Sequence, residues 1–309
     1  MPVASVALPE SLTWVKEALR IIGQANPAPL LAAVLAYASL ILLYSLRWLV
    51  ALRSVGVRAS ISSALKSYFL SLLVNNITPS SRAGGELVRA GYIYIRSNRG
   101  TSTAARIATA LAFERLTEAI PAVGLAILAA GWSIYAGRSI PIASLGGALL
   151  VVVLLVVGVK YWDRWMELAA RKLGANIGSD AIRLKDMIGN RRLMAIFIST
   201  GVVVWALDVV RIYLVAAAVG APLSGPKLIL ATITYIVLGL FSLTPGGLGI
   251  VEGGFTATLK ALGLKASEAL SITLLERAIS YGLSTLMGLV VLAAEGGRSL
   301  LSTIRSQWR

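Results

Sequence analysis

Residues 243–254 read LTPGGLGIVEGG, and they interrupt one of the most apolar parts of the chain. A proline, five glycines and a glutamate neither propagate a helix well nor suit a surface that faces lipid. A related stretch, ITPSSRAGGE, occupies residues 77–86. In both stretches an apolar residue precedes Thr-Pro, and a glutamate follows the proline by seven residues. The two stretches therefore predict two equivalent breaks between helices.

The breaks belong to a longer internal repeat. The break itself recurs at an offset of 166 residues, and a Glu-Arg pair in a downstream apolar run recurs at an offset of 162 residues. The equivalent residues are Thr78, Pro79, Glu86, Glu114 and Arg115 in the first half and Thr244, Pro245, Glu252, Glu276 and Arg277 in the second. Matching order and spacing favour an ancient duplication with a four-residue change in length over coincidence.

The composition indicates a membrane protein. The 309 residues are 57% hydrophobic, and their mean hydropathy is +0.80. Lys and Arg number 29 against 14 Asp and Glu, but they cluster between apolar runs, so membrane topology and anionic headgroups explain them better than nucleic acid. The chain has no Cys and no His, which excludes thiolate nucleophiles, imidazole bases and Cys/His metal sites. We expect no nucleic-acid partner, no metal and no cofactor.

The fold that these features predict is an all-α, multi-pass integral membrane protein with a single membrane domain over residues 1–309. Its expected parts are an amphipathic N-terminal segment (1–28), a first repeat (29–135), a joining span (136–160), a basic cytoplasmic connector (161–191), a second repeat (192–295) and a basic tail (296–309). The expected helical runs are 9–23, 29–50, 61–77, 86–96, 103–134, 142–160, 193–219, 227–242, 250–262 and 267–294.

The runs that follow the two breaks are short for a membrane crossing. Residues 86–96 would form a helix of about 16 Å and residues 250–262 one of about 20 Å, against a hydrocarbon core of about 30 Å. Each break is therefore interpreted as the tip of a re-entrant hairpin, which is tolerated where the backbone is buried in protein or lines a wet cavity. The positive-inside rule then gives an outside N-terminus and a cytoplasmic C-terminus. The joining span inverts the second copy, an arrangement typical of transporters.

Ionisable residues at mid-depth in a membrane are costly, so they are expected to face the protein interior and to bind a substrate or one another. The predicted substrate-binding residues are Asn75, Asn76, Thr78, Arg82, Glu86, Arg89, Glu114, Arg115, Thr244, Gly246, Gly247, Glu252, Glu276 and Arg277, with Glu118 beside them. Arginines and glycine-flanked backbone N–H groups would hold an anion, and glutamates would orient the arginines. The alternative is that these residues only clamp helices and permit tight turns. Asp208 and Arg211, at i and i+3, are interpreted as a structural pair.

Four motifs resemble the lysylphosphatidylglycerol synthase transmembrane family, also described as flippase-like membrane proteins. They are NNITPSSRAGGELVRA (75–90), ARIATALAFERLTE (105–118), LTPGGLGIVEGGF (243–255) and ALSITLLERAIS (269–280). The resemblance extends over most of residues 60–295 and implies movement of lipids with polar headgroups between leaflets. Some family members carry a soluble aminoacyl-transferase domain after the membrane part. This chain ends at Arg309 without one, so lipid aminoacylation is not expected.

The sequence therefore predicts a flippase or scramblase of the cell membrane rather than an enzyme. Its substrate would be a phospholipid or a polyprenyl-phosphate-linked lipid in a polar cavity between the two hairpins. One alternative is an intramembrane enzyme that uses a glutamate as base, although the absence of His and Cys disfavours it. Another is a non-catalytic membrane scaffold for a lipid-modifying partner such as a glycosyltransferase.

Overall fold

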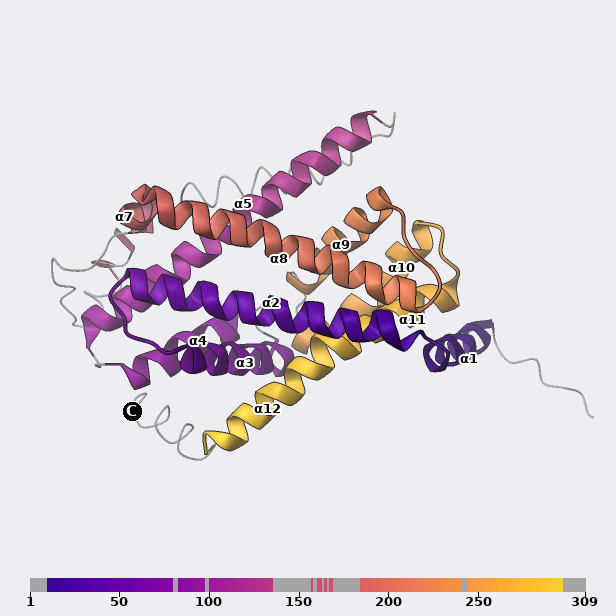
Figure 1. Ribbon diagram of the computed structural model, residues 1–309, viewed down its shortest axis with the longest axis horizontal. Helices are drawn as coiled ribbons and strands as arrows, with labels where there is room; N and C mark the ends of the chain where they lie inside the picture. The colour runs from indigo at the N-terminus through magenta and orange to yellow at the C-terminus, as the bar shows by residue number, and fades with distance from the viewer. Residues whose placement is uncertain are drawn as a thin grey trace, which may run out of the picture. The chain divides into compact units, whose positions relative to one another are not determined.

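The computed structural model describes residues 10–79, 83–97, 100–135, 184–240 and 244–296, with 157, 160–162, 164–165 and 167–168. Regular secondary structure in this part of the chain is helical throughout, which confirms the predicted all-α class. The elements labelled in Figure 1 are α1 (Glu10–Gly23), α2 (Pro27–Ser54), α3 (Ile61–Ile77), α4 (Ala83–Arg96), α5 (Thr101–Tyr135), α7 (Leu184–Gly189), α8 (Arg191–Ala218), α9 (Gly225–Leu240), α10 (Ile250–Ala261), α11 (Ala266–Arg277) and α12 (Ser284–Ala294). A 3₁₀ turn, Pro245–Gly247, precedes α10, and a π-helical turn, Ala278–Leu283, joins α11 to α12.

The predicted helical runs agree closely with the observed helices. The run 61–77 coincides with α3, whereas α4 begins at Ala83, three residues before the predicted start. Within the described residues, three helices are long and apolar enough to cross a membrane: Pro27–Ser54, Arg191–Ala218 and the continuous run Ala266–Ala294, with mean hydropathies of 2.0, 2.2 and 1.5. The predicted joining span (136–160), connector (161–191) and basic tail (296–309) fall largely outside the described residues.

Polar residues at the helix starts explain several boundaries. Asn26 accepts a hydrogen bond from the Ala28 N–H at 3.0 Å, directly before α2, and Pro27 suits the first helical position. The Ser60 hydroxyl accepts from the Ser63 N–H at 3.1 Å at the start of α3. Asn190 accepts from the Leu193 N–H at 3.1 Å at the start of α8. These side chains satisfy N–H groups that have no partner inside the helix.

The chain forms two compact units, each assembled from separated segments. Unit 1 comprises Met1–Ala38, Asn75–Arg82 and Leu207–Met287, and unit 2 comprises Ser39–Val74, Ala83–Ala206 and Gly288–Arg309. The helices α2, α3, α8 and α12 each contribute residues to both units. Both units therefore take segments from both halves of the sequence repeat.

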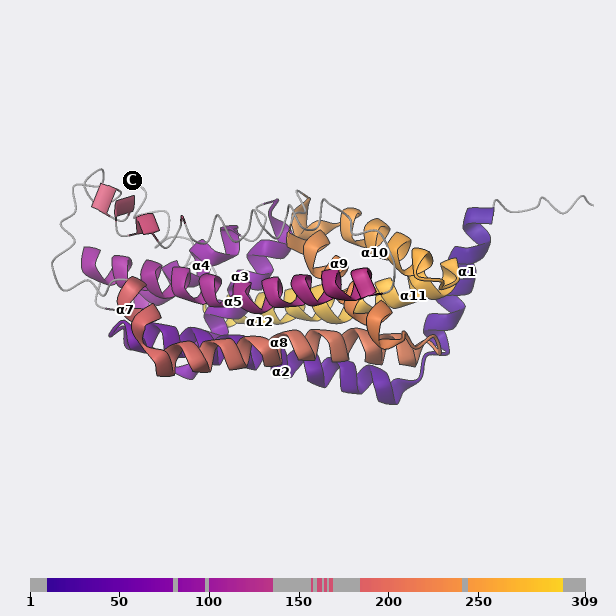
Figure 2. The same ribbon diagram turned by 90° about the horizontal axis from the view of Figure 1, so that it is seen from above.

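Unit 1 is built around α11. The helices α1 and α10 both pack against α11, and α9 packs against α10, as Figures 1 and 2 also show. The predicted amphipathic helix near the N-terminus is confirmed as α1. Ala18 on α1 is fully buried, its carbonyl accepts a hydrogen bond from the Ser271 hydroxyl at 3.0 Å, and the next residue, Leu19, is 59% exposed. One face of α1 therefore docks on α11, while an apolar residue remains outside.

Unit 2 has a core of large side chains. Trp48, Leu52, Ile93, Phe113 and Phe197 are fully or almost fully buried, and α4 packs against α5. The rings of Phe113 and Phe197 meet edge to face with centroids 4.9 Å apart, a favourable aromatic geometry. This packing fixes the part of α5 that carries the Glu-Arg pair.

The second helix break is a tight turn that only glycine allows. Gly246, Gly247 and Gly249 have φ angles of 57°, 77° and 82°, in the left-handed region that side chains disfavour. A Cβ on Gly246 would lie 2.3 Å from the Tyr281 ring and 2.8 Å from the Asn76 carbonyl oxygen. Asn76 lies in the last turn of α3, so the second break packs against the end of α3 and against Tyr281 within unit 1.

Replacing Gly246 by alanine tests this packing. We expect Gly246→Ala to destabilise the protein by about 1–3 kcal/mol from backbone strain alone, with a further penalty from contact with Tyr281. The apparent melting temperature in detergent should fall accordingly. The matched control is Gly253→Ala, because a Cβ on Gly253 in α10 would meet no atom within 4 Å, and alanine favours a helix over glycine by about 1 kcal/mol. If Gly246→Ala has the same apparent melting temperature as the wild type, the assigned turn is contradicted.

Candidate functional site

The interior of unit 2 holds an arginine between two carboxylates. The Arg89 side chain is fully buried, and its Nη2 lies 2.6 Å from Glu86 Oε2 and 2.9 Å from Glu114 Oε2. Glu114 is also fully buried. The Arg89 guanidinium carbon lies 4.4 Å from the Trp48 ring centroid and 5.8 Å from that of Tyr68. The buried cation is thus stabilised by carboxylates and by aromatic faces together.

A second arginine extends this cluster toward the surface. Arg115 forms ion pairs with Glu86, which it shares with Arg89, and with Glu118. The Tyr44 hydroxyl donates a hydrogen bond to Glu118 at 2.8 Å. The Arg115 side chain is 37% exposed, so it is the accessible cation of the unit 2 cluster.

Unit 1 contains a corresponding buried arginine. Arg211 is 3% exposed, and its Nη2 lies 2.7 Å from Asp208 Oδ1 while its Nη1 lies 2.9 Å from Glu276 Oε1. Glu276 is fully buried. The Arg211 guanidinium carbon lies 5.2 Å from the Tyr37 ring centroid and 5.9 Å from that of Tyr235. Again two carboxylates and two aromatic rings enclose one guanidinium.

Arg277 links the unit 1 cluster to the second helix break. Its Nε donates to Glu252 at 2.7 Å, its Nη2 donates to the Gly246 carbonyl at 2.8 Å, and its guanidinium carbon lies 4.4 Å from the Tyr281 ring centroid. The other Glu252 oxygen accepts from the Gly249 N–H at 2.6 Å, so Glu252 also caps α10. Arg277 is 12% exposed. The glycine turn is therefore held by Arg277 and Glu252, two residues that the repeat had singled out.

The two clusters match the sequence repeat pair by pair. Glu86–Arg115 corresponds to Glu252–Arg277, and the buried Glu114 corresponds to Glu276. The buried arginine differs in origin, because the position in the second half that corresponds to Arg89 is Phe255. Arg211, from α8, takes that role instead. Asp208 and Arg211 were predicted to be a separate pair, although the missing arginine in the second repeat was a signal that Glu276 needed a partner from elsewhere.

Asn76 fastens the first break to the π-helical turn. Its Nδ2 donates to the hydroxyls of Ser284 and Thr285 at 3.0 and 2.8 Å and to the Tyr281 carbonyl at 3.3 Å. The Tyr281 hydroxyl donates back to the Asn76 carbonyl at 3.3 Å. This network occupies the Asn76 side chain, which was predicted to be a headgroup ligand.

The remaining predicted site residues lie at the two breaks. Asn75 and Thr78 are half-buried at the end of α3, and Gly247 is buried in the second turn. The Thr244 hydroxyl donates to the Leu248 carbonyl at 2.9 Å, which closes that turn. Arg82 lies outside the described residues.

A further buried cation, Arg47, was not among the predicted site residues. This side chain is 2% exposed, and its Nη1 donates to the Phe197 carbonyl and, at 2.6 Å, to the Thr200 hydroxyl. Its guanidinium carbon lies 4.8 Å from the Phe197 ring centroid. The available signal was a single arginine inside the otherwise apolar run 29–50.

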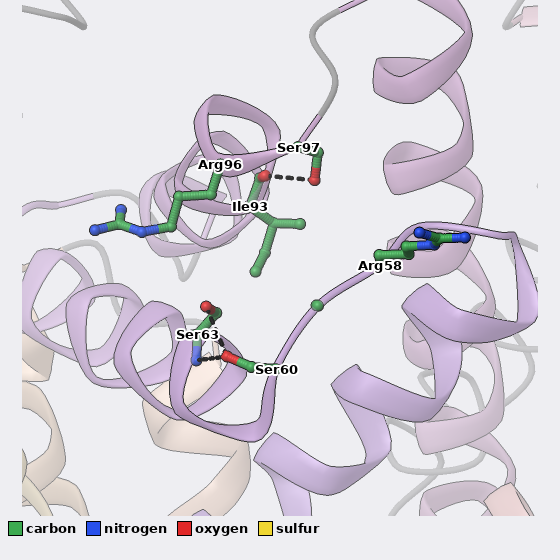
Figure 3. Close-up of a pocket in the computed structure, with 7 residues that line it drawn as sticks. Arg58, Ser60, Ser63, Ile93, Arg96 and Ser97 are labelled. Atoms are coloured by element: carbon green, nitrogen blue, oxygen red, sulfur yellow. Dashed lines mark hydrogen bonds between the residues drawn. The ribbon is translucent and has the colours of Figure 1, made fainter.

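A pocket of about 330 Å³ lies in unit 2, between the α2–α3 connection and the end of α4. Its lining residues are Arg58, Ala59, Ser60, Ser63, Ile93, Arg96 and Ser97 (Figure 3). In Figure 3 the guanidinium groups of Arg58 and Arg96 point away from each other. The Ser97 hydroxyl donates to the Ile93 carbonyl at 2.9 Å, and the Ser60 and Ser63 hydroxyls bond to each other at 3.0 Å. These hydroxyls are already engaged, so the two ion clusters are the stronger candidate site.

Three helices meet near this pocket at Glu295, just beyond α12. Lys66 Nζ lies 2.8 Å from Glu295 Oε1, and Arg96 pairs with the other oxygen. The hydrogen bond from Lys66 and the positive charges of Arg96 and Lys66 lower the pKa of the Glu295 carboxyl. The ion pairs thus tie α3 and α4 to the end of α12.

Comparison with known proteins agrees with the sequence motifs. A family model described as the lysylphosphatidylglycerol synthase TM region matches residues 6–288, which confirms the resemblance inferred above. A UPF0104 membrane protein of Pyrococcus horikoshii is 24% identical over 93% of both chains. One from Methanothermobacter thermautotrophicus is 31% identical over 82% of this chain and 79% of its own length. Glycosyltransferase AglD of Haloferax volcanii is 25% identical over 88% of this chain but only 50% of its own length.

Removal of the buried Arg89 charge should strongly destabilise the folded protein. Arg89→Met leaves two carboxylates without their shared cation, and breaking a buried ion pair in this way costs about 3–5 kcal/mol. We expect a large fall in the apparent melting temperature in detergent, partly restored in Arg89→Met/Glu114→Gln because one uncompensated charge is then removed. Arg58→Met is the matched control, since Arg58 is exposed. Equal melting temperatures for Arg89→Met and Arg58→Met would contradict a stabilising role for the ion pairs of Arg89 with Glu86 and Glu114.

The Glu295 ion pairs predict a pH-dependent contribution to stability. Because the folded protein lowers the pKa of Glu295 from its ordinary value of 4.5, the contribution is present above about pH 4.5 and is lost as the pH falls through the lower folded value. Glu295→Gln should therefore lower the melting temperature at neutral pH but match the wild type at acidic pH. Lys66→Gln should act in the same direction at neutral pH. A Glu295→Gln deficit that persists unchanged in acid would contradict this origin.

Proposed function

Because the chain belongs to the lysylphosphatidylglycerol synthase transmembrane family, we propose that it moves a lipid with an anionic or polar headgroup between the leaflets of the cell membrane. The described residues include several helices apolar enough to cross a bilayer, and a few charged side chains are buried inside the two units, namely Arg47, Arg89, Glu114, Arg211 and Glu276. Intramembrane ionisable residues of this kind commonly mark substrate or ion pathways.

The observation that carries the proposal is the pair of equivalent arginines, Arg115 and Arg277. Each is partly accessible, each follows a buried glutamate, and each is paired with a glutamate in the first turn after a helix break. A guanidinium binds phosphate oxygens in a bidentate geometry. A lipid phosphate can therefore exchange with Glu86 or Glu252 as the partner of the accessible arginine.

The inner arginines serve a different purpose in this proposal. Arg89 and Arg211 are at most 3% exposed, so a headgroup cannot reach them without opening the cluster. They hold Glu114 and Glu276 and fix the helices that present the outer arginines. We therefore propose Arg89 and Arg211 as inner clamps and Arg115 and Arg277 as headgroup ligands.

One relative bears on the choice of partner. AglD is named as a glycosyltransferase, and this chain matches half of its length. That name favours a glycosyltransferase as a functional partner, and we propose a polyprenyl-phosphate-linked sugar as the lipid. We propose transport without chemistry, with the N-terminus outside and the C-terminus in the cytoplasm, as the basic residues predict.

The outer arginines provide the direct test. Purified protein in liposomes is assayed for translocation of fluorescent phosphatidylglycerol and of a polyprenyl-phosphate-linked sugar. Arg115→Ala/Arg277→Ala should reduce the rate by roughly 10–100-fold, because a hydrogen bond to a charged group contributes about 1.5–3 kcal/mol. Arg192→Ala, at an exposed arginine at the start of α8, is the matched control and should retain the wild-type rate.

Three outcomes would contradict the proposal. Equal translocation rates for the double variant and the control would show that Arg115 and Arg277 do not bind the headgroup during transport. Recovery of the lipid with altered covalent structure would favour an intramembrane enzyme. Absence of translocation, together with protein-dependent activity of an added glycosyltransferase, would favour a scaffold.

A further inference from the structure

The ion cluster of unit 1 has an excess of negative charge. Its three carboxylates, Asp208, Glu252 and Glu276, face two guanidinium groups, those of Arg211 and Arg277. Arg277 is committed to Glu252 and to the Gly246 carbonyl, and Arg211 is shared between Asp208 and Glu276. An uncompensated charge in a buried site is costly, and neutralisation of one carboxylate by a proton is the usual remedy.

Glu276 is the carboxylate least supported by hydrogen bonds. It is fully buried, and among the described residues neither of its carboxyl oxygens receives a hydrogen bond. Arg211 Nη1 lies 2.9 Å from Oε1 and forms an ion pair with it, but no hydrogen bond joins the two atoms. Asp208, in contrast, accepts a hydrogen bond from Arg211 at 2.7 Å. An ionised carboxylate normally gathers donors, so this environment favours the neutral acid at Glu276.

The charged and titratable groups that act on Glu276 come from four helices. These are Tyr37 from α2, Asp208 and Arg211 from α8, Tyr235 from α9 and Arg277 from α11 itself. The Tyr37 hydroxyl donates to the Ser280 carbonyl, and the Tyr235 hydroxyl bonds to the Ser280 hydroxyl, both at 2.7 Å. Both phenols are therefore engaged with the π-helical turn, and Arg211 is the cation in direct contact with Glu276.

Unit 2 repeats the imbalance at the equivalent position. Its described cluster contains three carboxylates, Glu86, Glu114 and Glu118, and two guanidinium groups, Arg89 and Arg115. The fully buried Glu114 also receives no hydrogen bond at either carboxyl oxygen from the described residues. Recurrence of the same environment at a duplicated glutamate argues against an accident of packing.

We propose that the Glu276 carboxyl group binds one exchangeable proton and that this proton is the coupling ion for lipid movement. The coupling rests on the proposed transport function, whereas the proton site stands on the cluster geometry alone. On release, the carboxylic O–H bond breaks, the proton passes to water, and the negative charge remains on Glu276.

The structure offers a route from this charge to the helix break. Glu276 directly precedes Arg277, which holds the Gly246 carbonyl, and the π-helical turn that follows presses Tyr281 against Gly246. A new charge on Glu276 attracts the neighbouring Arg277 electrostatically and so opposes its hold on the turn. π-Helical turns are frequent at functional sites, which fits this position.

Infrared difference spectroscopy tests the proton site without any need for transport. Protein in lipid nanodiscs is titrated from acidic to alkaline pH, and the C=O stretch of protonated carboxylic acids is followed. We expect a band that persists at neutral pH and disappears at higher pH. Glu276→Gln should remove the part of this band that belongs to Glu276 and leave only the part that belongs to Glu114. Glu17→Gln, on the exposed surface of α1, is the matched control and should retain the band. Glutamine mimics the protonated acid, so Glu276→Gln should melt at the wild-type temperature, which separates a lost site from unfolding.

Proteoliposomes with an imposed pH gradient test the coupling. The gradient should accelerate lipid translocation by the wild type and by Glu17→Gln but leave the rate of Glu276→Gln unchanged. If the carboxylic band is present at neutral pH but no lipid is translocated under any condition, the proton site is supported and the proposed transport function is contradicted. If the translocation rate does not depend on the pH gradient and no carboxylic band is assigned to Glu276, the proton proposal is overturned and the transport function is supported. A response to a sodium gradient in place of the pH gradient would also overturn it.

Discussion

The structure depends on the burial of a guanidinium group that needs carboxylate partners. A charged side chain in a low-dielectric interior is tolerated only when it is paired, and loss of one partner leaves a costly residual charge. Arg89 therefore holds α4 against α5 through Glu114, and Arg211 holds α8 against α11 through Glu276. Each unit adds two aromatic rings to its cation, which supplies contact without further charge. The buried pairs thus set which helices meet.

The second helix break is held in place by residues next to these buried ion pairs. Gly246 adopts a left-handed conformation with Tyr281 and Asn76 so close that no side chain fits. Arg277 binds the same turn through its carbonyl and also pairs with the cap of α10. A substrate anion that takes this arginine would release the turn at the same moment. In the proposed function, one side chain of unit 1 would therefore connect headgroup binding with backbone rearrangement.

Much of this organisation could be predicted from the sequence, because hydropathy and internal repetition can be recognised without knowledge of the tertiary structure. The boundaries of α3 and α10 and the Glu-Arg pairs followed from apolar runs and from the matching breaks. The contact between Arg211 and Glu276 did not, because it joins residues far apart in the chain and replaces Arg89 by an arginine from another helix. The π-helical turn and the buried Arg47 also depend on tertiary packing, which periodicity does not encode.

The central claim is that the accessible arginine of each cluster exchanges its glutamate for a lipid phosphate. Electron cryo-microscopy of the protein in nanodiscs that contain the transported lipid tests it most directly. We predict headgroup density in contact with the guanidinium of Arg115 or Arg277, with the corresponding glutamate pair opened. Headgroup density confined to the outer surface, with both Glu86–Arg115 and Glu252–Arg277 intact in every class of particles, would contradict it.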